Sequence, residues 1–407
     1  MARLKLATIR ASLVVAGGLL VTSCYDNNYN FTPYWWDSGV VVADFDGDGT
    51  LDVAVVQTYV TGAPNAGYVA IYLQTAPGTF AAPVRYPVGP DPWAIAAGDL
   101  DGSGHVDLVV TTPRATPGVP DTGEIAILRH DPSRPGAFLA AQILQTGGSG
   151  DAVAIGDVTG DGRADIVVAD ASVSDAHVIL FAQSTTGTFS APPVSLSIGA
   201  NRGSNDVTIH DMDGDGRADI VMAVSDGVAI LYDNGAGSFL SPVFVAAGIN
   251  PQGIAVADVD ADGRPDMVVA NAGYSLLGGT GGASVSVLRQ TVAGSFTSSS
   301  IAVPDGAVQP VIADLDHDGL PDIGVLSFDF LDIDSDGQSQ VSILRQTAAS
   351  PGSFTLTATY NTTLGGSFMA AGDVNADGYT DLVVDNPAAV MLQQTTAPGT
   401  FAAPKGL

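Results

Sequence analysis

Short apolar runs follow one another along the chain, separated by acidic or glycine-rich stretches. Runs such as GVVVAD, AIAAGD and GIAVAD lead into an acidic stretch, and runs such as DVAVV, DLVV and DIVV leave it. Apolar and β-branched residues over four to eight positions between turn residues are typical of β-strands. Because no window keeps a helical period, the pattern predicts an all-β protein.

Two further runs complete each unit of the pattern. The third follows a variable loop, as in YVAIYLQ, EIAILRH and SVSVLRQ, and the fourth opens with glycine, a small residue and phenylalanine. The phenylalanine recurs at Phe80, Phe138, Phe189, Phe239, Phe296, Phe354 and Phe401. Four strands in each unit are the blade of a β-propeller, and we interpret the phenylalanine as core between blades.

A nine-residue acidic stretch repeats seven times. The copies begin at Asp44, Asp99, Asp157, Asp211, Asp258, Asp314 and Asp373. Their spacing averages about 55 residues, as expected of a repeat architecture, and seven such units fill the chain from residue 24 onward. We therefore expect a seven-bladed propeller of four-stranded antiparallel blades over residues 34–407, with the acidic loop between the first and second strands. The ring should close between blades one and seven, and no room remains for a separate catalytic domain.

The net negative charge of the chain limits the classes of molecule that it can bind. The 407 residues are 46% hydrophobic, with 43 acidic residues against 14 Lys and Arg and a net charge of -29. All the acids except Glu124 are aspartates, and aspartate is favoured in turns and as a ligand of hard cations. So negative a surface repels phosphate, which excludes nucleic acid as a partner.

The first acidic loop, DFDGDGTLD, holds aspartates at places one, three, five and nine and no basic residue. A plain turn needs only one Asp and one Gly, whereas oxygens at places one, three, five, seven and nine can surround Ca²⁺. Place seven would offer its backbone carbonyl, and the glycine at place six allows the sharp turn. Candidate ligands by loop are Asp44, Asp46, Asp48, Thr50, Asp52; Asp99, Asp101, Ser103, His105, Asp107; Asp157, Thr159, Asp161, Arg163, Asp165; Asp211, Asp213, Asp215, Arg217, Asp219; Asp258, Asp260, Asp262, Arg264, Asp266; Asp314, Asp316, Asp318, Leu320, Asp322; and Asp373, Asn375, Asp377, Tyr379, Asp381.

Three loops depart from this pattern. Ser103, Thr159 and Asn375 each replace an aspartate, which removes one charge and should weaken those sites. We therefore expect loops one, four, five and six to bind Ca²⁺ most tightly. An eighth cluster, Asp332 to Gln340, either binds Ca²⁺ peripherally or is a solvated acidic loop.

These units resemble the FG-GAP or VCBS-type repeats of integrin α-subunit propellers and of many bacterial surface proteins, over essentially the whole mature chain. The loops differ from EF-hands, which have twelve residues and lie between helices. The resemblance implies up to seven structural Ca²⁺ ions. It also implies a ligand face opposite the calcium loops.

The N-terminal residues have the pattern of an export signal. Arg3, Lys5 and Arg10 precede a short apolar stretch, and VTSC ends at Cys24, the only cysteine. This resembles the lipobox of bacterial lipoproteins, which implies a signal peptide over residues 1–23, lipidation at Cys24 and a tether over residues 24–33. We expect export to the bacterial cell envelope, with the outer membrane or cell surface favoured over the inner membrane and the lipid anchor as the sole membrane contact. The alternative is an ordinary secretory signal with an incidental cysteine.

The sequence favours a binding module over an enzyme. The five histidines share no spacing and no nucleophile motif accompanies them, although aspartate pairs brought together by folding stay open. A protein or glycan would bind the face opposite the loops, where we place the candidates Trp35, Trp36, Trp93, Asp151, Arg202, Asn205 and Gln252. The alternative for the tryptophans is a packing role. An assembly scaffold of an envelope complex is the alternative function, with a polysaccharide-active enzyme less favoured.

Overall fold

The computed structural model describes residues 34–60, 66–113, 123–170, 175–190, 192–200, 202–273, 282–304, 306–328, 339–362 and 366–407. The predicted signal peptide (1–23), the tether (24–33) with Cys24, and residues 332–338 of the eighth acidic cluster lie outside these ranges. Trp35 and Trp36 are described only as part of the backbone of a strand. Within the described ranges, no helix has both the length and the apolar character needed to cross a bilayer.

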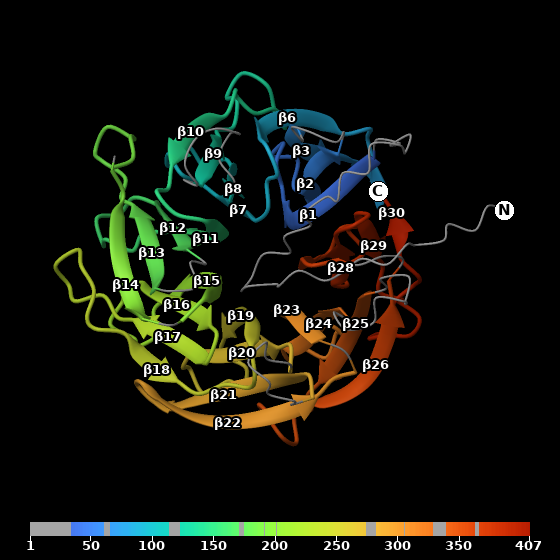
Figure 1. Cartoon of the computed structure of the whole chain (residues 1–407). Coiled ribbons are helices and arrows are strands. Elements are labelled where there is room, and N and C mark those ends of the chain that lie inside the picture. The colour runs from blue at the N-terminus through green and yellow to red at the C-terminus, as the bar shows by residue number, and fades with distance from the viewer. Residues whose placement is uncertain are drawn as a thin grey trace, which may run out of the picture.

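Seven four-stranded antiparallel sheets surround a central axis (Figure 1). Each sheet takes its strands from one continuous part of the chain, in order from the central axis to the outer edge of the ring (Figure 1). The predicted all-β, seven-bladed propeller is therefore confirmed. The inner strands contact one another around the ring, and contacts between β1 and β27 close it between blades one and seven.

The strands of the first four blades are as follows. Blade one contains β1 (Tyr34–Ala43), β2 (Asp52–Val60), β3 (Ala66–Tyr72) and β6 (Val84–Gly89), with β4 (Gln74–Ala76) and β5 (Thr79–Phe80) as a separate small hairpin. Blade two contains β7 (Ile95–Gly98), β8 (Asp107–Thr112), β9 (Glu124–Leu128) and β10 (Gln142–Gln145). Blade three contains β11 (Gly150–Gly156), β12 (Asp165–Asp170), β13 (Asp175–Phe181) and β14 (Val194–Ala200). Blade four contains β15 (Ser204–His210), β16 (Asp219–Val224), β17 (Gly227–Leu231) and β18 (Val243–Val245).

The remaining blades repeat the plan. Blade five contains β19 (Pro251–Ala257), β20 (Asp266–Asn271), β21 (Ser284–Val292) and β22 (Ser295–Ala302). Blade six contains β23 (Gly306–Ala313), β24 (Asp322–Phe328), β25 (Ser339–Arg345) and β26 (Thr355–Asn361). Blade seven contains β27 (Met369–Gly372), β28 (Asp381–Val384), β29 (Ala389–Met391) and β30 (Lys405–Gly406). In every blade the acidic loop joins the first strand to the second, as the sequence pattern predicted.

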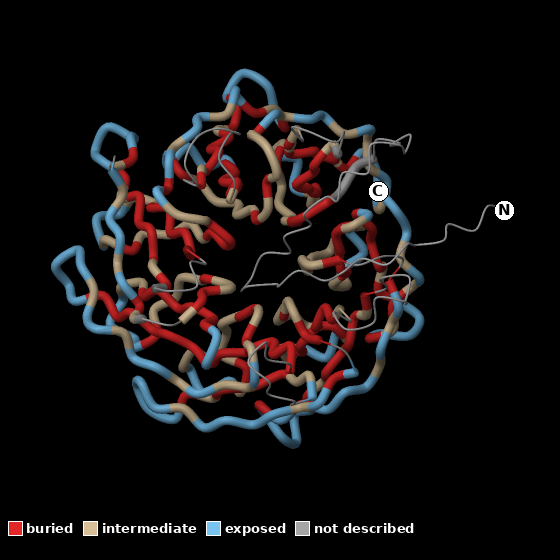
Figure 2. Tube along the Cα trace, viewed as in Figure 1, coloured by how far each residue is buried: buried red, intermediate tan, exposed pale blue. Residues whose placement is uncertain are grey.

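Burial follows the order of strands within a blade. The second strands are apolar and fully buried, whereas the outer strands are largely exposed (Figure 2). Hydrophobic clusters are shared between neighbouring blades, and Phe138 of blade two lies edge-on to Phe45 and Tyr86 of blade one at 5.8 and 5.6 Å. The recurring phenylalanine thus packs between these blades, but the expectation that it opens the fourth strand was wrong for blades one, two, three, four and seven, where it lies in a separate hairpin or an isolated bridge. Phe138 forms an isolated bridge with His130, and the outer strand β10 begins at Gln142.

Five of the inner strands carry a bulge near one shared position. The pairing register shifts around Asp151 in β11, Asn205 in β15 and Gln252 in β19, and similar shifts occur in β1 and β23. A bulge leaves one residue unpaired and redirects its side chain. Because each inner strand runs toward its acidic loop, these bulges lie near the opposite face of the ring.

Candidate metal-binding loops and the opposite face

The aspartate at place one organises each acidic loop. In loop one, Asp44 accepts the N–H groups of Gly47 (2.7 Å), Asp48 (3.1 Å) and Gly49 (2.9 Å). The bond from the place-six N–H recurs in all seven loops at 2.7 to 2.9 Å. The place-six glycines have φ between +81° and +89°, a region that glycine occupies without strain. The structure therefore agrees with the sharp turn predicted for this place.

The aspartate at place nine is buried and bonded to backbone in every blade. One carboxylate oxygen accepts the N–H of place two in its own loop, at 2.8 to 3.2 Å. The other oxygen accepts the N–H of the residue at the end of the third run, at 2.7 to 3.1 Å. Sequence reasoning assigned this place only to metal. In the fold, the same carboxylate joins the loop to the connection between strands three and four.

Several loops bring enough carboxylates together to hold a metal ion. In each of five loops, three aspartates offer oxygens within 4.8 Å of one another; the sets are Asp44, Asp46, Asp48; Asp99, Asp101, Asp107; Asp211, Asp213, Asp219; Asp258, Asp260, Asp262; and Asp314, Asp316, Asp322. Place nine contributes to three of these sets. Loops three and seven, which have Thr159 and Asn375 at place three, contribute no such set among the described residues.

Buried oxygens without partners support the fit of a cation. One carboxylate oxygen of Asp260 and one of Asp316 are buried and have no hydrogen-bond partner. Burial, followed by the charge of the place-five aspartate, raises the pKa of both side chains. Burial likewise raises the pKa of Asp322 and Asp381 to about 7. Each of these carboxylates would be stabilised in its charged form by a nearby cation, and all-oxygen ligand sets suit Ca²⁺.

Arginines approach the loops of blades two to six. At place seven, the guanidinium groups of Arg163, Arg217 and Arg264 contact the place-five aspartate of their own loop. From the end of the third strand run, Arg129 lies 3.1 Å from Asp107, Arg289 lies 3.7 Å from Asp260, and Arg345 lies 3.5 Å from Asp316. Among the described residues, no ion pair reaches loop one or loop seven. At these two positions loop one has Thr50 and Leu73, and loop seven has Tyr379 and Leu392.

A glutamine connects neighbouring loops. The residue bonded to the place-nine aspartate is glutamine in five blades, and its amide reaches the place-two carbonyl of the preceding blade in four of them. The four glutamines are Gln183, Gln290, Gln346 and Gln393. Sequence reasoning missed this contact, although the repeated glutamine at the end of the third run is visible in the chain.

Blades two and four replace this glutamine. In blade four, Asp233 pairs with Arg217 at 2.6 Å. In blade two, the His130 ring stacks on His105 at 4.3 Å, and burial, followed by the charge of His105, lowers the pKa of His130. Because the two ring planes are nearly parallel, at 11°, their lone pairs do not converge on one metal ion.

On the opposite face, four of the predicted ligand-binding residues occupy one equivalent position. Trp93, Asp151, Asn205 and Gln252 each lie six residues before place one, at the start of the inner strands of blades two to five. The same position holds Ser38, Val308 and Ser367 in blades one, six and seven. The structure thus arranges the large candidates on four consecutive blades. We call the position six residues before place one, in each blade, the rim position.

The remaining candidates behave differently. The Arg202 guanidinium lies 3.9 Å from the centre of the Phe244 ring and 2.8 Å from Asp226, so intramolecular partners engage it away from the rim position. The half-buried Trp93 ring lies edge-on to Phe368 of blade seven at 5.8 Å. The predicted place of the Trp35 and Trp36 side chains on this face stays a prediction, because both side chains lie outside what the structure describes.

Comparisons with known proteins agree on the repeat and the fold. A model of the FG-GAP-like repeat matches residues 58–110, 157–222 and 211–269, and a model of the FG-GAP repeat matches residues 365–400. No curated protein matches the chain in sequence.

Three of the similar solved structures are two rhamnogalacturonan lyases and a gluconolactonase. The exotype rhamnogalacturonan lyase YesX is 12% identical with a TM-score of 0.54, covering 87% of this chain and 71% of its own. The Bacillus licheniformis rhamnogalacturonan lyase PL11 is 13% identical with a TM-score of 0.51, covering 87% and 70%. The Pseudomonas aeruginosa periplasmic gluconolactonase PpgL is 13% identical with a TM-score of 0.51, covering 92% and 97%. At these identities the likeness concerns the fold alone.

Proposed function

The chain is a seven-bladed propeller of the FG-GAP repeat family, and from this premise we propose that it is a calcium-stabilised binding module of the bacterial cell envelope. Its ligand, a protein or a glycan, contacts the face opposite the acidic loops. Cys24 anchors the module to the membrane through lipid, at the outer membrane or cell surface. The ring itself performs no catalysis.

The rim position is the observation that carries this proposal. Four consecutive blades present Trp93, Asp151, Asn205 and Gln252 there, whereas the other three blades present two serines and a valine. A purely structural position repeated by a ring would hold similar residues in every blade. An aromatic ring beside polar groups is the composition of a sugar or peptide contact, and all four residues lie on one side of the ring.

The rim is also rigid, which favours binding because less freedom is lost on contact. The Asn205 amide donates to the Pro251 carbonyl of the next blade at 2.5 Å, and the Gln252 amide donates to the Asn250 side chain at 3.0 Å. Asp151 is 9% exposed. Burial raises its pKa to about 7, although a hydrogen bond from Ser149 acts in the opposite direction.

Calcium serves structure rather than chemistry in this proposal. The loops supply carboxylate oxygens at places one, three, five and nine and lie at the other end of the inner strands from the rim position. When bound, Ca²⁺ would offset the repulsion of these carboxylates. The chain's own place-nine aspartates and glutamines then hold each loop against its blade.

A glycan array and a co-purification from detergent-solubilised membranes test the proposal. Trp93→Ala and Gln252→Ala should each lower ligand binding about tenfold or more, a typical effect of removing an anchoring side chain. Val308→Ala, at the same position in blade six, is the matched control and should bind like the parent. Equal losses in all three variants, or no ligand from either source, would contradict a binding role for the rim.

A further inference from the structure

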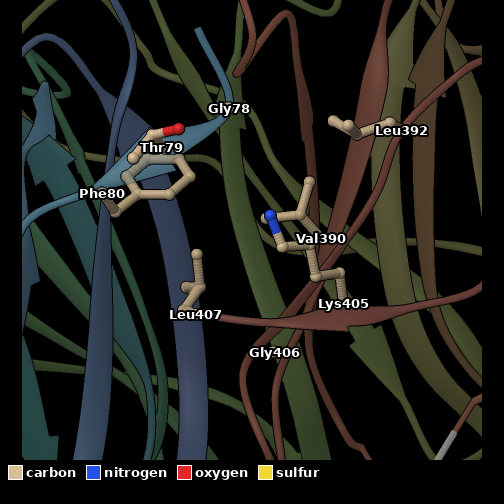
Figure 3. A pocket seen from close by; sticks show the side chains of 8 residues that line it. All are labelled: Gly78, Thr79, Phe80, Val390, Leu392, Lys405, Gly406 and Leu407. Atoms are coloured by element: carbon tan, nitrogen blue, oxygen red, sulfur yellow. The ribbon is translucent and has the colours of Figure 1, made fainter. Parts of the chain in front are cut away.

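A cavity of about 210 Å³ lies where the ring closes between blades one and seven (Figure 3). It is lined by the β4–β5 hairpin of blade one and by the last two strands of blade seven with the residues beside them. The apolar part of the lining is Phe80, Val390, Leu392 and Leu407. Because an apolar cavity of about 150 Å³ is large enough to bind benzene, this cavity has room for an aromatic ring with a short substituent.

Leu407 occupies a position that holds tyrosine in two other blades. Tyr86 of β6 and Tyr360 of β26 lie opposite one particular residue of the third strand. The equivalent residue of blade seven is Ala388, whose carbonyl accepts the Leu407 N–H at 3.0 Å. The remaining blades hold the aliphatic residues Leu144, Leu196, Val245 and Ile301 at this position.

The two tyrosines show which chemistry this position offers to the next blade. The Tyr86 ring lies edge-on to Phe138 of blade two at 5.6 Å, and the Tyr360 ring lies edge-on to Phe401 of blade seven at 5.8 Å. Each tyrosine hydroxyl accepts the N–H of that phenylalanine at 3.2 Å. At the closing seam the equivalent phenylalanine is Phe80, and the Leu407 side chain offers it neither a ring nor an oxygen. The cavity lies between these two side chains, so it suits an aromatic ring that carries an oxygen acceptor.

Lys405 adds a positive charge to the same cavity. Its side chain extends from β30 past Val390, and its nitrogen points toward Phe80 (Figure 3). Lys405 pairs with Val390 of the third strand. The other six blades have uncharged residues at this register position, namely Val84, Gln142, Val194, Val243, Ser299 and Ala358. The charge is therefore a feature of this seam and not of the repeat.

The Lys405 ammonium is unpaired within the part of the chain that the structure describes. Every described arginine has an ion pair or a hydrogen bond to another side chain. Lys405 has neither, and Lys5 is the one other lysine of the sequence. In a chain of net charge -29, an unpaired cation at the edge of an apolar cavity favours a ligand with an apolar body and a negative charge.

We propose that this cavity binds a small aromatic carboxylate. The ring of the ligand lies edge-on to Phe80, as Tyr86 and Tyr360 lie against the phenylalanine at their own seams. The carboxylate accepts a charge-assisted hydrogen bond from Lys405. Because the ligand contacts both blades, it stabilises the closed ring by mass action. The lining includes no residue of the acidic loops or of the rim position, so this site is separate from the binding face proposed above.

Binding of phenylacetate to the full chain, followed by ligand-observed NMR and by the melting temperature, tests the proposal. Phenylacetate should bind and raise the melting temperature. Phenylacetamide, which lacks the charge, and acetate, which lacks the ring, should bind about tenfold or more weakly. Lys405→Gln should weaken phenylacetate binding about tenfold or more. Arg134→Gln removes an exposed cation from blade two and is the control, which should bind like the parent. No binding of phenylacetate to the parent at millimolar concentration, or equal binding by Lys405→Gln, would overturn the proposal.

A cavity-filling variant gives a second readout that does not depend on Lys405. Leu407→Tyr gives blade seven the side chain that blades one and six have at this position. It should raise the melting temperature of the ligand-free protein and abolish phenylacetate binding, because its ring takes the place of the ligand. Leu144→Tyr, at the same position in blade two, is the matched control and should leave phenylacetate binding unchanged. A Leu407→Tyr protein that binds phenylacetate like the parent would overturn the assigned site.

Discussion

Replacing Gln346 probes how the loop of one blade is held against the next. Gln346 is 2% exposed, and its amide donates to Val259 of loop five at 2.9 Å and to Pro321 of loop six at 2.5 Å. Its side-chain oxygen accepts the Gly352 N–H at 2.8 Å. Gln346→Leu keeps the volume and removes all three hydrogen bonds.

The expected loss follows from these bonds. At about 1 kcal/mol net for each buried hydrogen bond, Gln346→Leu should lower the free energy of unfolding by about 3 kcal/mol. The entropy of unfolding of a ring of roughly 370 residues is about 0.8 kcal/mol/K, so the melting temperature should fall by about 4 °C. Burial of the added apolar groups offsets part of this loss, by about 1 kcal/mol.

Gln346→Glu separates the hydrogen bonds from shape. It places a carboxylate against two carbonyl oxygens, and a buried unpaired charge costs about 3–5 kcal/mol, so this variant should melt below Gln346→Leu at neutral pH. In blade four a carboxylate at the equivalent position, Asp233, is neutralised by an ion pair with Arg217. Adding Leu320→Arg to Gln346→Glu should therefore recover part of the loss, because Leu320 is at the place of Arg217.

The assay is thermal unfolding followed by circular dichroism in saturating Ca²⁺, with the single and double variants compared as a cycle. The expected order of melting temperature is parent, Gln346→Leu, Gln346→Glu, with the double variant above Gln346→Glu. A Gln346→Glu protein as stable as the parent, or a double variant that shows no recovery, would refute the assigned role of the glutamine.

Three further predictions follow from the loops, the buried carboxylates and the N-terminal motif. Chelation should lower the melting temperature by several degrees, because carboxylates at about 4 Å repel by about 1 kcal/mol per pair even in water; a calorimetric scan with metal analysis checks this, and an unchanged scan of a metal-free protein would contradict it. Burial raises the pKa of Asp206 to about 7, so its contribution to stability is full below about pH 4 and is lost as pH rises through about 7; Asp206→Asn should flatten the fall in melting temperature between about pH 4 and pH 7, and a parallel fall in both proteins would count against it. Cys24 should be the lipidated first residue of the mature protein, which intact-mass analysis detects, and palmitate labelling of Cys24→Ser would rule it out.

The fold could be predicted because the repeat encodes it locally. Each blade carries the same order of apolar runs and one acidic loop, so strand number, loop placement and closure between blades one and seven follow from counting. The rim position could be placed on one face for the same reason, since Asp151, Asn205 and Gln252 stand at equal distances before their loops.

The contacts between blades could not be predicted from the sequence. The glutamine contacts of Gln183 and Gln290 join residues far apart in the chain, at separations of 83 and 78 positions, and no local pattern states which carbonyl they reach. The dual role of the place-nine aspartate also depends on the return of the chain after the third strand. Arg202 was placed among ligand candidates from its position alone, but the fold brings Phe244 and Asp226 against it.

The bulges on the inner strands separate what the ring presents from what keeps it folded. In blades three, four and five the backbone register fixes where the rim residue stands, while burial of the strand depends on its neighbours. One residue per blade can therefore be exchanged without a change in the register of the sheet, although replacing Asn205 also removes its hydrogen bond to Pro251 of the next blade. A small library that varies positions 151, 205 and 252 together would change three side chains on this face while the fold stays constant. Binding specificity could be altered there without redesigning a blade.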